Sequence, residues 1–382
     1  MNYDRLPVNT LVGADKETLR RIVEGREIDE DRIFCYRLTS LLQKILWLFG
    51  RGQERKYRRL LADKPLGYDP FFILGHWRSG TTFVHNIFAQ DPHFAHTTTY
   101  QTCFPHLMMR WQWLFKFFMN LAIPERRPTD YMPLSVDQPQ EEEFALQNTC
   151  PITYYNFWVF PKSMREYCDR FLTMKKATRE ETEEFKEQFQ KLVKISIWNT
   201  ENLHPEGYKY DRLQYLSKNP PHTGKVKILT EMFPEARFLH LRRNPYTVFE
   251  SSRAFISETM VPLQWNCITM EELEQNILYA YRELYFAYEE QKKYIPEGHL
   301  MEVKFEDIEH NPYETIKSIY EKLSLPNWEE AEPQIRKYIE SQRRYKKNSY
   351  SYEPRTIKLV NEAIGDLIPQ MGYDLIKENN NN

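Results

Sequence analysis

The chain has 382 residues, of which 41% are hydrophobic and 15% aromatic, so it is long enough to bury a substantial core. Its net charge of −2 argues against a general nucleic-acid partner. The five cysteines are scattered without metal-ligand spacing, and residues 1–5 contain no apolar signal region, so we expect a cytoplasmic enzyme with reduced thiols and no metal site.

Residues 1–65 are expected to form a helical lead-in. The apolar stretch at 38–50 reaches barely half the span of a bilayer, and residues 104–124 carry charges, so we expect no transmembrane helix. A basic run follows the first stretch directly and consists of Arg51, Arg55, Lys56, Arg58 and Arg59. An apolar stretch followed by a basic run fits either a helix packed on the core with a solvated basic end, which we favour, or peripheral docking on an anionic membrane.

A glycine-bounded turn comes next, after an apolar strand that begins at Phe71. Its spacing is Gly75-x4-Gly80 followed by two threonines and a helical pattern, which is how α/β proteins build a phosphate cradle. A nucleotide-hydrolysing P-loop would place lysine directly after the second glycine, whereas here Thr81 stands there and the cation is Arg78. The loop therefore suits phosphate but not ATP with magnesium.

Residues 105–205 are predicted to be an insertion dominated by helices. An aromatic and methionine-rich stretch at 104–119 is apolar on most sides, which is typical of a segment that lines a hydrophobic pocket, covers the core or contacts a membrane. The charged run at 175–194 has apolar residues at helical spacing and predicts a solvated amphipathic helix.

Strands resume near Leu213, Arg237 and Leu300. The fold class is therefore α/β, with a P-loop-like parallel sheet flanked by helices and a helical insertion. We expect one domain over 66–375 and a disordered tail at 376–382. After the strand near Arg237, an Asn-Pro turn opens a new helix, so Arg243 and the hydroxyl of Ser251 can converge beyond the strand's carboxyl end.

Together these segments resemble the sulfotransferases that use 3′-phosphoadenosine-5′-phosphosulfate (PAPS), over residues 71–325. Arginine followed by Ser-Gly-Thr-Thr resembles their 5′-phosphosulfate loop, and residues 236–252 are similar to the stretch whose arginine and serine grip the 3′-phosphate. Residues 215–221 and 303–312 also look like the family. The resemblance implies sulfuryl transfer from PAPS to a hydroxyl, with PAP as product and no metal.

The chemistry of sulfuryl transfer and the resemblance together suggest roles for individual residues. Arg78 in the loop would meet the charge that develops on the sulfuryl group, and Lys218, beyond a predicted strand end, is a candidate second cation for that charge. Arg243 and Ser251 would hold the 3′-phosphate, with the basic residues Lys346 and Lys347 closing over it. The 5′-phosphate would be held by Arg78 and by the loop residues Ser79, Gly80, Thr81 and Thr82.

The general base is the point at which the chain departs from part of the family. Cytosolic sulfotransferases carry Thr-His-Leu-Pro, and here Cys103 occupies the histidine's place, which leaves His106 as one alternative. The acidic triplet Glu141–Glu143 resembles a segment of bacterial lipid-type sulfotransferases, related branches of which use a glutamate as base. We expect the base at Glu141 or Glu143, with Glu142 facing solvent.

Composition suggests the acceptor. The aromatic stretch favours a hydrophobic alcohol such as a sterol, another polycyclic compound or a lipid, over a carbohydrate. The rival interpretations are a P-loop nucleotide kinase or hydrolase and an inactive nucleotide-binding scaffold. The oligomeric state does not follow from the sequence.

Overall fold

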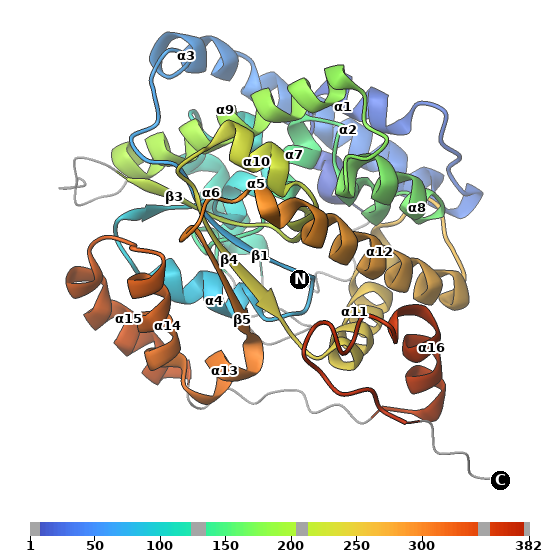
Figure 1. Cartoon of the computed structure of the whole chain (residues 1–382). Coiled ribbons are helices and arrows are strands. Elements are labelled where there is room, and N and C mark those ends of the chain that lie inside the picture. Colours follow the sequence, from blue (N-terminus) through green and yellow to red (C-terminus); the bar gives the residue numbers. More distant parts are fainter. Residues whose placement is uncertain (1–7, 124–134, 204–212, 343–351, 378–382) are drawn as a thin grey trace.

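A computed structural model describes residues 8–123, 135–203, 213–342 and 352–377 of the chain (Figure 1). At its centre lies a parallel sheet with the strand order β2-β3-β1-β4-β5. The strands are β1 (Phe71–Gly75), β2 (Phe94–Ala95), β3 (Gln214–Lys218), β4 (Arg237–Arg242) and β5 (Leu300–Lys304). The predicted fold class is confirmed, and β2 is a short edge strand that the sequence pattern did not indicate.

Helices cover both faces of the sheet (Figure 1). They are α1 (Lys16–Val23), α2 (Ile33–Gly50), α3 (Gln53–Leu60), α4 (Thr81–Phe88), α5 (Thr99–Cys103), α6 (Gln112–Ala122), α7 (Glu143–Thr149), α8 (Met164–Tyr167), α9 (Arg179–Leu203), α10 (Val226–Met232), α11 (Pro245–Thr259), α12 (Met270–Gln291), α13 (Phe305–His310), α14 (Pro312–Lys322), α15 (Trp328–Gln342) and α16 (Pro354–Ile364).

The two faces of the sheet belong to different parts of the core. All five residues of β1 are buried, and because side chains alternate along a strand, Phe72 and Leu74 face one side while Phe71 and Ile73 face the other. The first side packs with α9, α10 and α12, and the second with α4, α14 and α15. Burial on both faces explains why β1 reads as a continuous apolar run.

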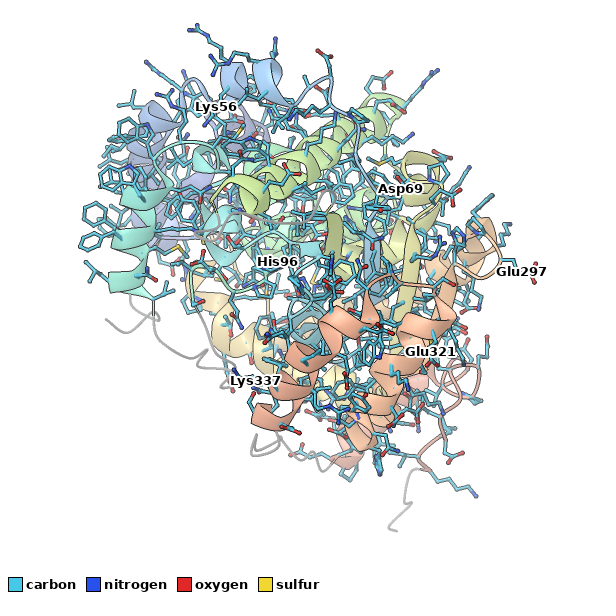
Figure 2. The ribbon with its side chains drawn as sticks, turned by 90° about the vertical axis from the view of Figure 1, so that its left-hand side faces the viewer. Lys56, Asp69, His96, Glu297, Glu321 and Lys337 are labelled. Carbon is cyan, nitrogen blue, oxygen red and sulfur yellow. The ribbon has the colours of Figure 1, made fainter. Side chains whose placement is uncertain are left out.

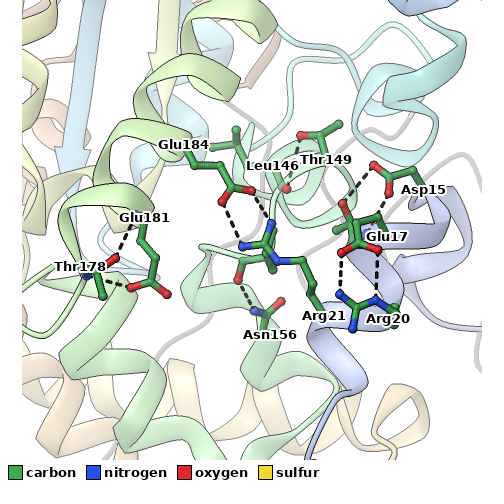
Figure 3. A network of polar contacts seen from close by, with 12 residues as sticks. Asp15, Glu17, Arg20, Arg21, Leu146, Thr149, Asn156, Thr178, Glu181 and Glu184 are labelled. Carbon is green, nitrogen blue, oxygen red and sulfur yellow. Dashed lines mark hydrogen bonds and ion pairs between the residues drawn. The ribbon is translucent and has the colours of Figure 1, made fainter.

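The lead-in is packed against the insertion. Leu19 and Ile22 of α1 share a buried cluster with Phe185 of α9. Figure 3 shows Arg21 of α1 reaching Glu184 of α9, with its two guanidinium nitrogens 2.6 and 3.0 Å from the carboxylate oxygens. The charged run at 175–194 thus lies mostly in α9, an amphipathic helix as predicted, and its apolar side is part of the core.

Among the described residues, no helix combines the length and the apolar character needed to cross a bilayer. The five cysteines are free thiols. Near the end of the chain, Ile376 donates its amide to Tyr246 Oη and accepts from Asn361 Nδ2, both at 3.0 Å, so it is held against α11 and α16. The last five residues of the predicted tail, 378–382, lie outside the described residues.

Candidate active site

The phosphate-cradle loop connects β1 to α4 and requires both of its glycines. Gly80 has φ +89°, and a Cβ on it would lie 2.2 Å from two ring carbons of Phe305. Gly75 has φ +141°, and a Cβ there would lie 2.7 Å from the carbonyl oxygen of Leu241. Only glycine combines these backbone angles with so little space. The loop is therefore held against β4 and α13, and the first amides of α4 lie at its end.

The strand order places this loop where the chain changes direction across the sheet. From β1 the chain continues to β2 and β3 on one side, and then crosses to β4 and β5 on the other. The carboxyl ends of β1, β3 and β4 meet at one edge, which is where α/β proteins bind ligands. Residues that follow β3 and β4 can thus reach the loop from opposite sides.

On the β4 side, three predicted donor-binding residues lie in direct contact. Arg243 Nη1 donates to the carbonyl oxygen of Arg78 at 3.0 Å, and Arg78 Nε donates to Ser251 Oγ at 2.9 Å. The Asn-Pro turn produces this convergence, because Asn244 caps α11 and accepts from the amide of Tyr246 at 3.0 Å. Ser251, two turns further along α11, is buried.

On the β3 side, Lys218 joins the loop to the acidic triplet. Its Nζ donates to Glu141 Oε1 at 2.6 Å and lies 3.4 Å from Thr82 Oγ1. The other oxygen of Glu141 accepts from the hydroxyl of Tyr155, which in turn accepts from Trp77 Nε1 at 2.8 Å. Lys218 is only 1% exposed and needs this counter-charge, whereas the Glu141 side chain is 15% exposed. A cation, a carboxylate and a phenol thus meet beside the loop.

The remaining loop side chains are largely internal. Ser79 is buried and its hydroxyl donates to the carbonyl oxygen of His76 at 2.6 Å, which fixes the turn. Thr81 is also buried. The amide of Gly75 donates to Thr223 Oγ1 at 2.8 Å, so the loop is tied to the segment after β3 as well.

Three consecutive glutamates contact three consecutive residues at the end of β3. Glu141 pairs with Lys218; Glu142 accepts from the hydroxyl of Ser217; and Glu143 accepts from Asn219 Nδ2 at 2.7 Å. The triplet is therefore a docking segment for the carboxyl end of β3, and each glutamate has a different environment.

The expectation that Glu142 faces solvent is wrong. Glu142 is 1% exposed, and burial raises its pKa to about 7. Its Oε1 also lies 3.6 Å from Nδ1 of His222, whose pKa burial lowers well below the usual value. The expectation assumed helical spacing for all three glutamates. Helix α7 begins only at Glu143, so the first two glutamates precede the helix and do not follow its spacing.

Glu143 is buried completely. Thr153 Oγ1 donates to its Oε1 at 2.7 Å, and Lys225 Nζ lies 3.6 Å from the same oxygen. Burial lowers the pKa of Lys225, and Glu143 supplies its counter-charge. With its side chain fully buried, Glu143 is poorly placed to meet an acceptor hydroxyl, whereas the partly exposed Glu141 is the accessible member of the triplet.

His106 packs against the lead-in. Its Nε2 lies 3.1 Å from the carbonyl oxygen of Asn148 and 3.5 Å from Asp15 Oδ2, and its ring meets Trp47 edge-on at 5.3 Å. Burial lowers its pKa. Cys103, in the place of the family histidine, has a pKa raised to about 11 by burial. These environments favour a structural role for both side chains.

Two predicted donor-binding residues, Lys346 and Lys347, lie outside the described residues.

A hollow of about 190 Å³ lies between α1, α9 and the segment after α8, and it is lined by Arg21, Arg26 and Arg170. Each of these arginines is paired with a glutamate, so the charges of the hollow are neutralised within the protein. Among the described residues, no group of three or more His, Cys, Asp or Glu side chains is arranged to hold a metal.

Sequence reasoning missed Tyr155 and Trp77 as members of the site. Trp77 is the second residue after β1 and lies within the loop, and that position was the available signal. Tyr155 lies in a second aromatic segment, and nothing local indicates that its hydroxyl reaches a carboxylate fourteen residues earlier.

Comparisons with known proteins found related sequences and similar folds. A family model described as "Sulfotransferase family" matches residues 70–330. Two curated relatives, from Mycobacterium bovis and Mycobacterium tuberculosis, are each named omega-hydroxy-beta-dihydromenaquinone-9 sulfotransferase Stf3; each is 27% identical over 338 residues, covering 88% of this chain and 84% of the relative.

Two solved structures have similar folds. Sulfotransferase STF9 from Mycobacterium avium superposes with a TM-score of 0.69 at 16% identity, covering 94% of this chain and 90% of its own. Sulfotransferase STF1 from Mycobacterium tuberculosis superposes with a TM-score of 0.65 at 14% identity, covering 92% and 90%.

Proposed function

This chain belongs to the sulfotransferase family, and we propose that it transfers the sulfuryl group of PAPS to the hydroxyl of an apolar, lipid-like acceptor. One observation supports the assignment of the site most directly. Glu141 stands between Lys218 and Tyr155 beside Thr82 of the loop, while Arg243 and Ser251 gather on the loop's other side.

The residues present fit a donor with two phosphate groups. The two glycines let the loop turn tightly against Leu241 and Phe305, and the loop ends at the backbone amides of the first turn of α4, which suit a 5′-phosphate. Arg243 and Ser251 lie on the β4 side, where a 3′-phosphate would receive one charged and one neutral donor. Arg78 contacts Ser251 in this structure, so its guanidinium can serve either phosphate or the transferred group.

When bound, PAPS supplies the activated sulfuryl group, and this chain supplies the proton acceptor and the charge stabilisation. Both oxygens of Glu141 accept hydrogen bonds, as an ionised carboxylate does. As the acceptor oxygen bonds to sulfur, its proton passes to Glu141. The bond between sulfur and the bridging oxygen breaks with its electron pair remaining on PAP, and the ammonium of Lys218 stabilises the negative charge that develops nearby.

Tyr155 and Trp77 would position Glu141. The Trp77 Nε1 to Tyr155 Oη to Glu141 chain fixes one carboxylate oxygen, and Lys218 fixes the other. Burial and the neighbouring Glu141 carboxylate raise the pKa of Tyr155 well above its usual value, so its hydroxyl remains a donor. The general base is thereby held in one orientation before the acceptor arrives.

Aromatic rings gather around Tyr155 and Trp77, the two residues that position Glu141. Tyr155 lies 4.8 Å from Phe144 and 5.8 Å from Trp158, measured between ring centroids, and Trp77 lies 5.3 Å from Tyr154. Such aromatic surroundings suit a lipid, a sterol or another polycyclic alcohol better than a sugar, which requires many polar partners. The curated relatives named for a menaquinone-derived lipid support the same class.

We further propose that the enzyme acts in the cytoplasm and requires no metal. The five free thiols match a reducing compartment, and Lys218 and the arginines can meet the charge of the donor directly. The deciding experiment incubates the protein with radiolabelled PAPS and separate panels of polyprenyl alcohols and quinols, sterols, phenols and glycans, with and without EDTA.

We expect label transfer to an apolar alcohol that survives EDTA. Transfer of label to glycans alone would show that the acceptor is a carbohydrate and not an apolar alcohol. Calorimetry with PAP and with ATP–Mg²⁺ tests the rivals, because tight binding of ATP–Mg²⁺ without PAP binding would support a nucleotide kinase. PAP binding without turnover on any panel would support an inactive scaffold.

A further inference from the structure

Exposed large apolar side chains are concentrated on one part of the molecule. Among the described residues there are sixteen such side chains, and ten of them belong to α2, to α6 or to Trp111, the residue directly before α6. They are Phe34, Leu41, Ile45, Leu48, Phe49, Trp111, Trp113, Phe117, Phe118 and Leu121. Single exposed apolar residues are ordinary, whereas a gathering of ten marks an interaction surface.

Helix α2 shows an unusual distribution of polarity. Its fully buried positions are Thr39, Gln43 and Gly50, and Gln43 Nε2 donates to the carbonyl oxygen of Ala14 at 2.9 Å. Its seven exposed positions are five apolar residues and two cations, Arg37 and Lys44. Phe34, Leu41 and Leu48 recur at intervals of seven, so they form one outward stripe. The helix therefore packs on the protein and still presents an apolar face outward.

Helix α6 extends the same surface. Trp113, Phe117 and Leu121 recur every four residues and are 72%, 58% and 71% exposed, which are high values for side chains of this size. Figure 2 shows α6, in teal, at the edge of the molecule with ring-bearing side chains projecting from it. Phe49 of α2 lies 5.4 Å from Phe115 and 6.1 Å from Trp111, so the two helices form one continuous apolar surface.

The charges at the border of this surface are mainly positive. Arg37, Lys44 and Arg51 are exposed and spaced seven residues apart, and α2 contains no acidic residue. Two of the acids nearby are paired, since Asp31 lies 3.2 Å from Arg32 and Asp137 accepts from Lys116 at 2.5 Å, while the exposed Glu30 lies beyond the amino end of α2. These three cations make no ion pair with the residues that the structure describes, and an apolar surface with such a border matches the interface of an anionic lipid bilayer.

We propose that α2 and α6 dock this protein on the surface of an anionic phospholipid membrane, with the apolar side chains entering the headgroup boundary and the three cations meeting lipid phosphates. Helix α6 of this surface also lies close to the candidate active site, because the two are linked by a short stretch of chain. Val136, five residues before Glu141, shares a buried cluster with Met119 of α6, so the base lies within about 18 Å of chain length from this helix. A lipid acceptor could pass from the bilayer to the site without crossing water, a consequence that rests on the proposed function.

The test is flotation with vesicles of phosphatidylcholine, with and without phosphatidylglycerol, in the absence of donor and acceptor. Docking is thereby measured independently of sulfuryl transfer. We expect binding to the anionic vesicles that the double variant Ile45→Glu/Trp113→Glu lowers at least about tenfold. Arg37→Gln/Lys44→Gln should lower binding to anionic vesicles about thirtyfold and leave binding to neutral vesicles unchanged.

Leu375→Glu is the matched control, because Leu375 and Ile45 are both 46% exposed and Leu375 lies outside the surface. Its binding should stay within about twofold of the unsubstituted protein. Should a glutamate variant unfold, quenching of tryptophan emission by brominated lipids provides a second measurement, and Trp113→Phe should reduce it. Absence of binding to anionic vesicles, or equal loss with Leu375→Glu, would overturn the proposal. A lipid-free dimer that Ile45→Glu/Trp113→Glu converts to monomer would instead assign the surface to a second copy.

Discussion

Substitution of Glu141 by glutamine separates chemistry from stability. Glutamine keeps the size of the side chain and one carbonyl oxygen that can accept from Lys218, but it cannot take a proton from the acceptor. A general base contributes about 10²–10⁴-fold, which corresponds to about 2.7–5.4 kcal/mol of the barrier. Turnover with radiolabelled PAPS and a saturating acceptor should fall by that factor, while PAP affinity measured by calorimetry changes little, because Arg243 and Ser251 are untouched.

The same substitution also removes the counter-charge of a buried cation. Lys218 is 1% exposed, and breaking a buried ion pair costs up to about 3–5 kcal/mol of stability. Glu143→Gln provides the matched control, because Glu143 lies 3.6 Å from Lys225, which is also fully buried. Both variants should unfold more readily in denaturant. Only Glu141→Gln should lose turnover per folded molecule.

Two results would refute this reasoning. If Glu141→Gln retains turnover within about tenfold of the unsubstituted enzyme, Glu141 is not the base. If Glu143→Gln loses as much turnover per folded molecule as Glu141→Gln, the effect comes from disruption of the triplet rather than from proton transfer. His106→Ala should cost less than about tenfold, and a complete loss there with active glutamine variants would transfer the role to the histidine.

Three further predictions concern donor binding, the loop and pH. Arg243→Ala should weaken PAP binding about 10- to 150-fold in calorimetry, since a hydrogen bond to a charged group contributes about 1.5–3 kcal/mol, and it should slow turnover at saturating PAPS less than it weakens binding. Gly80→Ala places a methyl group 2.2 Å from the Phe305 ring at φ +89°, so denaturant unfolding should show a loss of about 1–3 kcal/mol or more. The folded protein binds a proton at Glu142 up to about pH 7, against an ordinary value of 4.5, so this group's stabilising contribution is present below pH 4.5 and is lost as the pH rises to 7. Denaturation across that window should show unfolding free energy falling by about 3 kcal/mol relative to Glu142→Gln; equal slopes in the two proteins would contradict the raised pKa.

The fold could be predicted because its signals are local. The apolar run of β1, the glycine spacing of the loop and the Asn-Pro turn before α11 each constrain the backbone within a few residues. Parallel strands then bring their carboxyl ends together, which is why Arg243 and Ser251 were predicted to converge, and the structure places both in contact with Arg78.

The acceptor side was less predictable because its contacts join distant segments. The exposure of each glutamate depends on where α7 begins and on which β3 residue it meets, and neither is encoded in the local pattern. The same limit applies to α2, whose apolar composition suggests a core helix. Only the packing shows that Gln43 faces inward while Ile45 and Leu48 face outward.

The pairing of the acidic triplet with the end of β3 explains how Glu141 is held in position. A single glutamate on a loop of irregular backbone would be free to reorient, and a base that reorients loses the advantage of position. Here Glu142 and Glu143 are anchored to Ser217 and Asn219, the two neighbours of Lys218. The distance between Glu141 and Lys218 is therefore restricted by contacts on both sides of Lys218 and by the two anchored residues that follow Glu141. Two glutamates with buried, structural environments thus account for the placement of the third, which explains why the chain carries three acids where the chemistry requires one.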